Sequence, residues 1–366
     1  MTDLFEPLMF ARGAAMKNRF MLAPLTNCQS HDDGTLSDEE YRWLTMRAEG
    51  GFGLTMTCAA HVQAEARGFP GQLGIFSDAQ LPGLSRLAAA IRRVGSLAMA
   101  QLHHAGMRSP AALIGSQPVC PSDDAETGAR ALTLAEVERL VEDFAGAALR
   151  AERAGFDGVE LHGAHGYLLA QFLSADINRR EDRYGGSLEN RSRILFEILA
   201  AIRFRCRAGF NVGVRLSPER FGLRLPEMVT VAERLISSGA IDFIDLSLWD
   251  IFKEPMDAEF QGRSLLSYFT ALGRGPVRMG AAGKVSGGRD AARCLEAGLD
   301  FVIVGRAAVL HHDFPERVRA NPQFTASSLP VTPEYLRGEG LSPTFIGYMG
   351  NWKGFVAPGP GAAAQA

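Results

Sequence analysis

Three side chains that can donate a hydrogen bond or move a proton stand close together near the middle of the chain. They are His162, His165 and Tyr167, and they follow a short apolar run at 159–161 that predicts a buried strand. Such side chains can donate to a substrate oxygen or transfer a proton. One of them alone at a strand end is commonly structural, but three together indicate a catalytic or binding site.

A metal site is the first alternative for this cluster. His162 and His165 are three residues apart, which is close enough for both to hold one ion. No third ligand stands at a familiar spacing, and the HExxH pattern of zinc enzymes is absent. We therefore expect no metal.

Length and composition exclude several classes of protein. The chain has 366 residues, of which 46% are hydrophobic and 22% charged, with a formal net charge of −3. This suits one large barrel or two modest domains. The chain contains no basic run, so a nucleic-acid partner is not expected. No apolar stretch is long enough to predict a membrane span. The five cysteines are scattered without a C-x-x-C pair, as expected of reduced thiols in the cytoplasm.

A repeated pattern indicates the fold class. Four times a helical pattern ends in Ala-Gly or Ser-Gly and a short apolar run follows, which is typical of strands buried on both faces. These four strands are predicted at 159–161, 212–216, 243–246 and 301–304. Four more are predicted at 20–24, 53–57, 97–102 and 277–279. Eight strands alternating with helices favour an α/β protein with a single (β/α)8 TIM barrel over an open doubly wound sheet.

The two ends of the chain are expected to extend this barrel. Apolar pieces around Arg12-Gly13 predict an N-terminal hairpin that closes one end. We expect the barrel to occupy residues 1–320 and a C-terminal extension to occupy residues 321–366, with its last ~10 residues disordered.

Local signals define some connecting segments. Capping boxes at 37–40 and 133–136 predict helix starts. The segment 103–130 is too long for a plain connector and predicts a lid or binding loop. Structural roles are expected for the charged run 178–191 and for the histidine pairs at 103–104 and 311–312.

Polar side chains recur at the predicted carboxyl ends of the strands, where barrel enzymes build their sites. Thr26 follows the first strand, Gln101 ends the third and Arg215 lies in the fifth. The pair 283–284 follows the seventh strand and the pair 305–306 the eighth, where barrels commonly bind a phosphate. No G-x-G-x-x-G or P-loop pattern occurs, so a separate nucleotide domain is not expected.

Taken together, these residues resemble the old yellow enzyme family, whose members are FMN-dependent ene-reductases built on a (β/α)8 barrel. The matching stretches are 17–26, Gln101, 162–167, 178–191, 214–218 and 304–306, in the family's order. Any one of them is weak, but the set covers most of the chain and is highly specific. The resemblance implies bound FMN, with NADPH or NADH as the reductant that enters the same pocket in a ping-pong cycle.

The resemblance also implies which residues hold FMN. They are Pro24, Leu25, Thr26, Ala59, Gln101, Arg215, Gly283, Lys284, Gly305 and Arg306. Gln101 is expected to pair with the pyrimidine edge, and the Thr26 hydroxyl to contact a flavin carbonyl. Arg215 is expected near N1 and O2, where a guanidinium stabilises the charge left by reduction. The backbone of the last four residues is expected to hold the phosphate.

His162, His165 and Tyr167 are the catalytic residues that the resemblance implies. The histidines are expected to donate to the carbonyl or nitro oxygen of an α,β-unsaturated substrate, whose β-carbon accepts hydride from flavin N5. Tyr167 then delivers a proton to the α-carbon. Two alternatives stay open: another FMN barrel oxidoreductase of the 2-hydroxy-acid oxidase type, and a barrel that binds flavin or phosphate without turnover. A dienoyl-CoA reductase type is disfavoured, because its cluster cysteines are missing.

One loop departs from the family pattern, and the C-terminal extension departs from the rhythm of the barrel. Cys28 lies close behind Thr26 in a loop that has no tyrosine on the substrate side, so the sequence leaves that wall undefined. The extension carries aromatic residues at Tyr335, Phe345, Tyr348, Trp352 and Phe355. Some bacterial members of the family send their C-terminus into the active site of a neighbouring subunit, so the resemblance together with this aromatic surface implies a homo-oligomer, a dimer or tetramer, with the extension at the interface.

Overall fold

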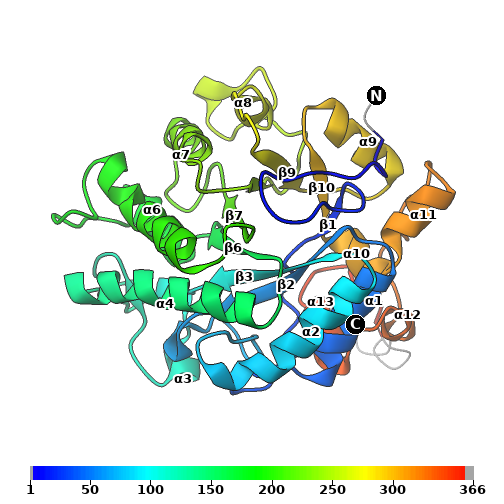
Figure 1. Ribbon diagram of the computed structural model, residues 1–366, viewed down its shortest axis with the longest axis horizontal. Helices are drawn as coiled ribbons and strands as arrows, with labels where there is room; N and C mark the ends of the chain where they lie inside the picture. Colours follow the sequence, from blue (N-terminus) through cyan, green and yellow to red (C-terminus); the bar gives the residue numbers. More distant parts are fainter. Residues whose placement is uncertain (1–2, 359–366) are drawn as a thin grey trace.

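A closed barrel of eight parallel strands forms the centre of the computed structural model, which describes residues 3–358 (Figure 1). In order around the barrel, the strands are β1 (Phe20–Leu22), β10 (Phe301–Val304), β9 (Arg278–Ala282), β8 (Phe243–Ser247), β7 (Asn211–Leu216), β6 (Gly158–Gly163), β3 (Leu97–His103) and β2 (Leu54–His61). Each strand pairs in parallel with both neighbours. The predicted (β/α)8 TIM barrel is therefore confirmed.

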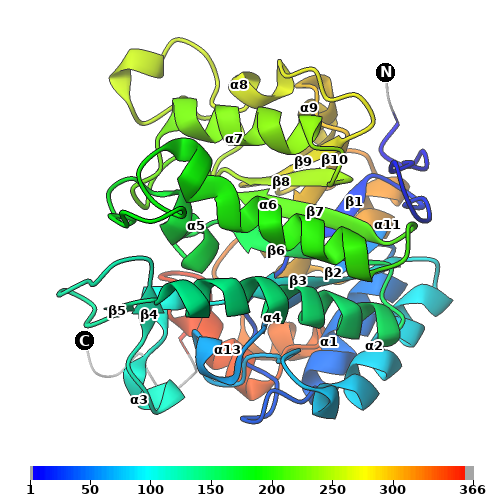
Figure 2. The ribbon, with the colours of Figure 1, turned by 60° about the vertical axis from the view of Figure 1, so that its left-hand side comes forward.

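Helices cover the outside of the barrel (Figures 1 and 2). They are α1 (Asp38–Glu49), α2 (Leu81–Arg93), α3 (Ala111–Ile114), α4 (Leu134–Arg153), α5 (Leu168–Leu173), α6 (Leu188–Arg205), α7 (Leu225–Ser237), α8 (Ser267–Thr270), α9 (Gly288–Glu296), α10 (Arg306–Leu310), α11 (Phe314–Ala320), α12 (Pro333–Gly338) and α13 (Pro343–Gly350). The long α4 shows why they pack there: Val137, Leu140 and Phe144 recur at three- and four-residue steps and are buried.

β2 is longer than its predicted range, and this brings more of the chain to the carboxyl end. The strand runs to His61, beyond the predicted end at residue 57. After an irregularity in register that begins at Met56, Ala59 continues the ladder opposite Gln101 of β3. The small residues near the end of β2 therefore pair with β3 where a loop was expected.

An apolar layer fills the amino end of the barrel. Its members are Leu8, Phe10, Met16, Met21, Ala23, Leu54, Met56, Leu97, Met99, Phe243, Phe301 and Ile303. Two glycines make room for the rings: a Cβ at Gly213 would lie 2.1 Å from Cζ of Phe243, and one at Gly280 would lie 2.2 Å from Cε2 of Phe301. The ends of segment 8–16 pair antiparallel below the layer, as the predicted hairpin requires.

One of the two predicted capping boxes forms and the other does not. At α4, both hydrogen bonds of the 133–136 box are present. At α1, the Ser37 hydroxyl accepts from the backbone N–H of Glu40, but the Glu40 side chain does not return the contact. It is buried instead and accepts from Nδ2 of Asn27 at 3.0 Å and from the Ser30 hydroxyl. The box prediction is wrong at α1 because Glu40 holds the loop after β1.

The long segment after β3 is ordered by short elements. It contains α3 and a two-stranded parallel sheet of β4 (Val119–Cys120) and β5 (Arg130–Ala131). The charged run 178–191 braces this segment, since Arg180 donates to the carbonyl of Pro121 at 2.9 Å. The structural role predicted for the run is confirmed.

The C-terminal extension folds back over the carboxyl end of its own barrel. The backbone N–H of Ser342 donates to Oε1 of Gln29 at 3.1 Å, and the rings of Trp43 and Phe345 pack edge to face at 5.4 Å. The disorder predicted for the last residues falls mainly on 359–366, outside the described residues.

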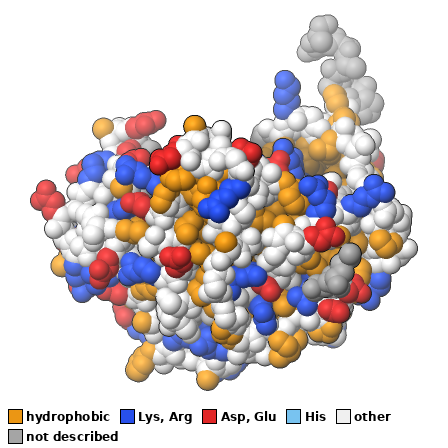
Figure 3. Space-filling view, turned by 90° about the horizontal axis from the view of Figure 1, so that it is seen from above, with side chains coloured by type: hydrophobic (Ala, Val, Ile, Leu, Met, Phe, Trp, Pro, Cys, Tyr) orange, Lys and Arg blue, Asp and Glu red, His pale blue; other side chains and the backbone are white. Residues whose placement is uncertain are grey.

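The surface and the helices carry two further observations. Positive and negative side chains are interspersed over the face seen in Figure 3, so that face presents no field of a single sign. Within residues 3–358, no helix combines the length and apolar character needed to cross a bilayer.

Candidate functional site

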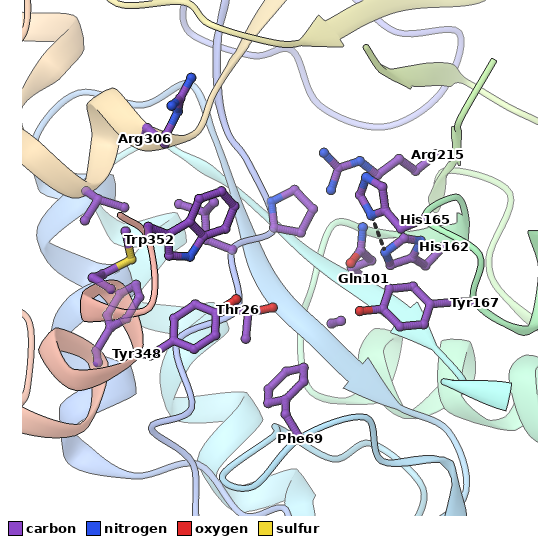
Figure 4. A pocket seen from close by; sticks show the side chains of 16 residues that line it. Thr26, Phe69, Gln101, His162, His165, Tyr167, Arg215, Arg306, Tyr348 and Trp352 are labelled. Atoms are coloured by element: carbon purple, nitrogen blue, oxygen red, sulfur yellow. Dashed lines mark hydrogen bonds between the residues drawn. The ribbon is translucent and has the colours of Figure 1, made fainter. Parts of the chain in front are cut away.

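A cavity opens at the carboxyl end of the barrel strands, between the barrel and α13 (Figure 4). Its volume is about 840 Å³, counting the part open to solvent. The lining residues are Pro24, Leu25, Thr26, Ala59, Phe69, Gln101, His162, His165, Tyr167, Arg215, Arg306, Val309, Phe345, Tyr348, Met349 and Trp352. This is the end at which barrel enzymes place their active sites.

All predicted site residues line this cavity except Gly283, Lys284 and Gly305. Gly305 directly precedes Arg306, and a Cβ there would meet nothing closer than 3.7 Å, so the backbone is open to a ligand. Gly283 packs tightly on the backbone of the loop 249–251, and Lys284 pairs with a carboxylate of that loop at 3.0 Å. Of the two predicted phosphate pairs, the structure brings only the one at β10 to the cavity wall.

The turn after β6 directs the catalytic candidates into the cavity. His165 and Gly166 both adopt left-handed backbone conformations, with φ of 59° and 67°. Such a conformation is uncommon outside glycine and is concentrated at functional sites. Gln171 of α5 holds the turn by donating to the Gly166 carbonyl at 2.8 Å. His162, His165 and Tyr167 consequently stand on one side of the same space (Figure 4).

Neighbouring groups fix the proton position on His162 and leave two positions open on His165. The backbone N–H of Ala164 donates to Nδ1 of His162 at 3.3 Å, which leaves the proton of the neutral ring on Nε2. That Nε2 faces Nδ1 of His165 at 3.3 Å, and Nε2 of His165 lies 2.7 Å from the Ser247 hydroxyl. Because a hydroxyl can donate or accept, His165 can carry its proton on either nitrogen. Ser247 has no signal in the sequence beyond its place at the end of a strand.

Both histidines are neutral at physiological pH. Burial lowers the pKa of His162 well below its usual range, and His165, His103 and Arg215 lower it further. Burial likewise lowers the pKa of His165, with Arg215 and Arg108 acting in the same direction. A neutral imidazole donates a hydrogen bond and keeps its proton. The pair is therefore suited to polarising an oxygen rather than to acting as the acid.

Tyr167 is the group in the cluster that can supply a proton. Its ring packs edge-on against His103, with the centroids 4.3 Å apart, and lies 4.9 Å from the guanidinium of Arg108. His103 is fully buried and does not line the cavity. Arg108 comes from the long segment after β3, so this segment contributes a cation next to the phenol.

The floor of the cavity is a buried polar layer. Nε2 of Gln101 donates to Oε1 of Glu160 at 2.7 Å, and Nε of Arg215 lies 2.9 Å from Oδ2 of Asp245. Gln101 and Arg215 reach the cavity, whereas Glu160 and Asp245 are fully buried beneath them. An amide and a guanidinium side by side fit the pyrimidine edge of a flavin, which offers an N–H donor and carbonyl acceptors.

The C-terminal extension supplies the wall opposite the histidines (Figure 4). Phe345, Tyr348, Met349 and Trp352 line the cavity from α13 and the turn after it. Tyr348 is hydrogen-bonded to Thr26, and burial raises the pKa of its phenol. The aromatic surface expected at an oligomer interface therefore lies, at Phe345, Tyr348 and Trp352, against the chain's own barrel.

Two other groups singled out by the sequence do not line the cavity. Burial, assisted by the charge of Glu40, raises the pKa of the Cys28 thiol to about 11, which makes it a poor nucleophile. Nδ1 of His312 donates to Oε2 of Glu339 at 2.7 Å, and Nδ1 of His311 lies 3.2 Å from the Tyr335 hydroxyl. These histidines tie the extension to the barrel, which is a structural role.

Known proteins share both the sequence and the fold. The chain matches the model of the NADH:flavin oxidoreductase / NADH oxidase family over residues 3–323. It is 36% identical over 327 residues to the probable NADH-dependent flavin oxidoreductase YqiG of Bacillus subtilis, covering 86% of this chain and 87% of that protein. It is 34% identical over 339 residues to the NADH:fumarate oxidoreductase of Klebsiella pneumoniae, covering 88% of this chain and 36% of that protein.

A solved structure gives the same result. The old yellow enzyme homologue from Zymomonas mobilis superposes with a TM-score of 0.79 at 28% identity, covering 93% of this chain and 99% of that one. The family match spans the barrel and every strand end that lines the cavity. The chain therefore belongs to the NADH:flavin oxidoreductase / NADH oxidase family and is an FMN-dependent oxidoreductase of the old yellow enzyme type, with NADH or NADPH as its reductant.

Proposed function

We propose that the protein is an ene-reductase that reduces the activated C=C bond of an α,β-unsaturated carbonyl or nitro compound. The observation that carries this proposal is the convergence of His162, His165 and Tyr167 above a floor of Gln101 and Arg215. Two neutral donors beside a proton source suit a substrate whose oxygen is polarised while a nearby carbon is protonated. FMN, when bound, supplies the hydride that it receives from NADH or NADPH.

The two histidines form the proposed seat for the substrate oxygen. Nε2–H of His162 and Nδ1–H of His165 can both point at an oxygen that enters between the rings, whose facing nitrogens are 3.3 Å apart. His165 carries its proton on Nδ1 when the Ser247 hydroxyl donates to Nε2. Ser247 therefore lets His165 change tautomer as substrate binds. Two hydrogen bonds to the oxygen draw electron density from the conjugated double bond.

Tyr167 is the proposed general acid. Its Oη delivers a proton to the α-carbon of the substrate, on the side opposite to the hydride. The Arg108 guanidinium lies 4.9 Å from the centre of the Tyr167 ring, so a cation stands beside the proposed proton donor. The proton is restored from solvent, to which Arg108 at the rim is exposed.

The remaining lining residues suit the proposed cofactor contacts. Pro24, Leu25 and Ala59 offer apolar surface for a ring system, and the Thr26 hydroxyl offers it a donor. The backbone at Gly305 and the Arg306 side chain are the proposed phosphate site, together with Gly283 and Lys284 near the end of β9.

We expect an uncharged substrate with an apolar or ring-bearing body. Arg215 and Arg306 are the charged side chains that line the cavity, and both are assigned to the cofactor. The rest of the wall is aromatic or apolar at Phe69, Val309, Phe345, Tyr348, Met349 and Trp352. The Klebsiella relative is named for fumarate, a dicarboxylate. Arg108 lies at the rim beside Tyr167 and does not line the cavity, so a dicarboxylate would find no unassigned cation among the lining residues, and we expect enones to be reduced faster than fumarate.

An anaerobic visible spectrum tests the proposal. The purified protein should show a flavin band that bleaches on addition of NADH or NADPH and returns on addition of 2-cyclohexenone. A yellow protein that never bleaches would indicate an oxidase of the 2-hydroxy-acid type or a barrel that only binds flavin. A colourless protein that takes up no FMN would overturn the assignment of the cavity residues.

Further expectations from the sequence accompany this proposal. We propose a division into a barrel of residues 1–320 and an extension of residues 321–366, with the extension completing the cavity. A cytoplasmic location and a homo-oligomer, dimer or tetramer, are proposed as well. Light scattering tests the oligomer, and a monomer in solution would contradict it.

A further inference from the structure

A fully buried carboxyl group lies beneath the proposed flavin site without a cation of its own. Glu160 points into the barrel from β6, and its Oε1 accepts from Nε2 of Gln101 at 2.7 Å. Its Oε2 has no hydrogen-bond partner within the described residues. The only cation in the layer, Arg215, is already paired with Asp245 at 2.9 Å. The strand register explains this pairing, because Arg215 of β7 lies opposite Asp245 of β8.

The charges of the buried polar layer indicate which carboxyl group, that of Glu160 or that of Asp245, is protonated. Arg215 and Asp245 cancel each other, so an ionised Glu160 would leave one uncompensated negative charge in a buried site, which is costly. Oε2 of Glu160 and Oδ1 of Asp245 also have no donor within the described residues. A proton on Glu160 removes the charge and supplies a donor among these acceptors.

The pKa directions agree with this count. Burial raises the pKa of Glu160 and the charge of Asp245 raises it further, while Arg215 and the hydrogen bond from Gln101 oppose the rise. Burial also raises the pKa of Asp245, but Arg215 acts against it directly. The carboxyl in contact with the guanidinium is the ionised one. Arg215 also faces His162 and His165, both neutral.

We propose that Glu160 is a positioning residue of the flavin site, a neutral acid that orients the amide of Gln101 and keeps the net charge of the layer at zero. This inference rests on the proposed placement of FMN over Gln101 and Arg215. Because Nε2 of Gln101 is held by Glu160, its carbonyl oxygen remains free for the N–H of a pyrimidine edge. Glu160 thus acts on the cofactor through Gln101 and through its own proton.

The proton has a consequence for the reduction potential. Reduction leaves negative charge near the pyrimidine edge, and a second negative charge on Glu160 would oppose it. Reduction therefore favours the protonated form of Glu160, and loss of this proton at high pH disfavours reduction. The midpoint potential of bound FMN should fall with rising pH more steeply than that of free FMN.

Potentiometric titration of the FMN-loaded enzyme over about pH 6 to 9 tests this inference. Glu160→Gln is a permanently neutral analogue that can still accept from Gln101. It should bind FMN, show the wild-type potential at low pH and lose the additional slope. Glu40→Gln is the matched control, because Glu40 is also fully buried but lies on α1 outside the polar layer. It should leave the slope unchanged.

A second measurement does not depend on the folding of any variant. The infrared spectrum of the wild-type holoenzyme should contain a protonated-carboxyl C=O band at neutral pH, which weakens when the pH is raised. Equal slopes in wild type and Glu160→Gln, or the absence of this band, would overturn the role of Glu160 while FMN binding stands. A protein that takes up no FMN would overturn the proposed function and this inference together.

Discussion

The two ends of the barrel are built from the same strands but are held together in different ways. On β3, Met99 of the apolar layer stands two positions before Gln101 of the polar layer, and on β8 Phe243 stands two positions before Asp245. At the amino end, rings fill space that glycines such as Gly213 leave open. At the carboxyl end, the buried ion pair of Arg215 and Asp245 neutralises two opposite charges away from water. Each of these two strands passes from the apolar layer to the polar layer within one step of its two-residue period.

This difference indicates that stability and chemistry are separated along the barrel axis. At neutral pH, substitutions at the amino end should change the free energy of unfolding and leave the cofactor site intact, and substitutions of the cavity residues at the carboxyl end should do the reverse. An amino-end variant that impairs FMN binding, or a cavity variant at the carboxyl end that lowers the free energy of unfolding, would contradict this separation.

The largest effect is expected from Phe243→Ala in the apolar layer. Removing a buried ring that packs on Phe10 and Phe301 should lower the free energy of unfolding by about 3–5 kcal/mol. Urea unfolding measures this loss, and the visible spectrum of bound FMN should stay unchanged. Met99→Leu, which conserves volume, should cost less than about 1.5 kcal/mol. Loss of FMN from folded Phe243→Ala protein would contradict the separation.

The next effect concerns the proton source at the other end. Tyr167→Phe should slow reoxidation of the flavin by an enone by about a hundredfold, because the general acid is lost. Flavin reduction by NADH should change little, since that step takes no proton from Tyr167. Stopped-flow absorbance separates the two half-reactions. A variant slowed equally in both would assign Tyr167 to binding rather than to proton transfer.

Acid should loosen the carboxyl end before the amino end. Burial lowers the pKa of His61, at the end of β2, to about 4 and that of His104, after β3, to about 3. Both folded values lie below the ordinary value of 6.5, so the unfolded chain binds protons first and stability falls as the pH drops below 6.5.

Urea unfolding at neutral pH and at about pH 5 measures this loss. Each histidine should contribute about 2 kcal/mol over that range. His61→Gln should reduce the acid loss, whereas His31→Gln, at an exposed position, should not. Equal losses of unfolding free energy in the wild type, His61→Gln and His31→Gln would show that acid does not act mainly on the carboxyl end.

The smallest effect is expected from Ser247→Ala at the carboxyl end of the barrel. It separates the roles of two hydroxyl groups that contact His165. The Nδ1–H tautomer of His165 needs a hydrogen-bond donor at Nε2, and the Ser247 hydroxyl is that donor. Without it, enone reduction should slow by about tenfold. Ser217→Ala should have less effect, because the Ser217 hydroxyl contacts only the backbone N–H of His165. Nitrogen-15 NMR of the histidines reports the tautomer directly, and an unchanged tautomer in Ser247→Ala would rule out this role.

Much of the cavity could be predicted because strand ends of a parallel barrel meet on one face. Thr26, Gln101 and Arg215 stand far apart in the sequence, yet the fold alone brings them together. Glu160 and Asp245 also had a signal, as acidic residues within apolar runs. Which carboxyl pairs with the guanidinium depends on the register of β7 and β8, and a local pattern does not contain that register.

The wall formed by α13 could not be predicted for a related reason. Its link to the loop after β1, from Ser342 to Gln29, joins residues 313 positions apart. Aromatic residues in the extension predict burial but not the surface that buries them, so an oligomer interface was an equally good interpretation. The side chain of Glu40 could not be placed from the sequence for the same reason. Its spacing from Ser37 satisfies the capping pattern, but the side chain accepts hydrogen bonds from the loop 27–30 instead.

The placement of α13 also sets an order on maturation. The first cavity residues, Pro24 to Thr26, emerge early from a translating ribosome, whereas Tyr348 and Trp352 emerge after the last barrel strand. A nascent chain can therefore close its barrel while the cavity still lacks one wall. The cavity is complete only when α13 has been synthesised and has docked, so the wall proposed for the substrate forms after the residues proposed to hold the cofactor.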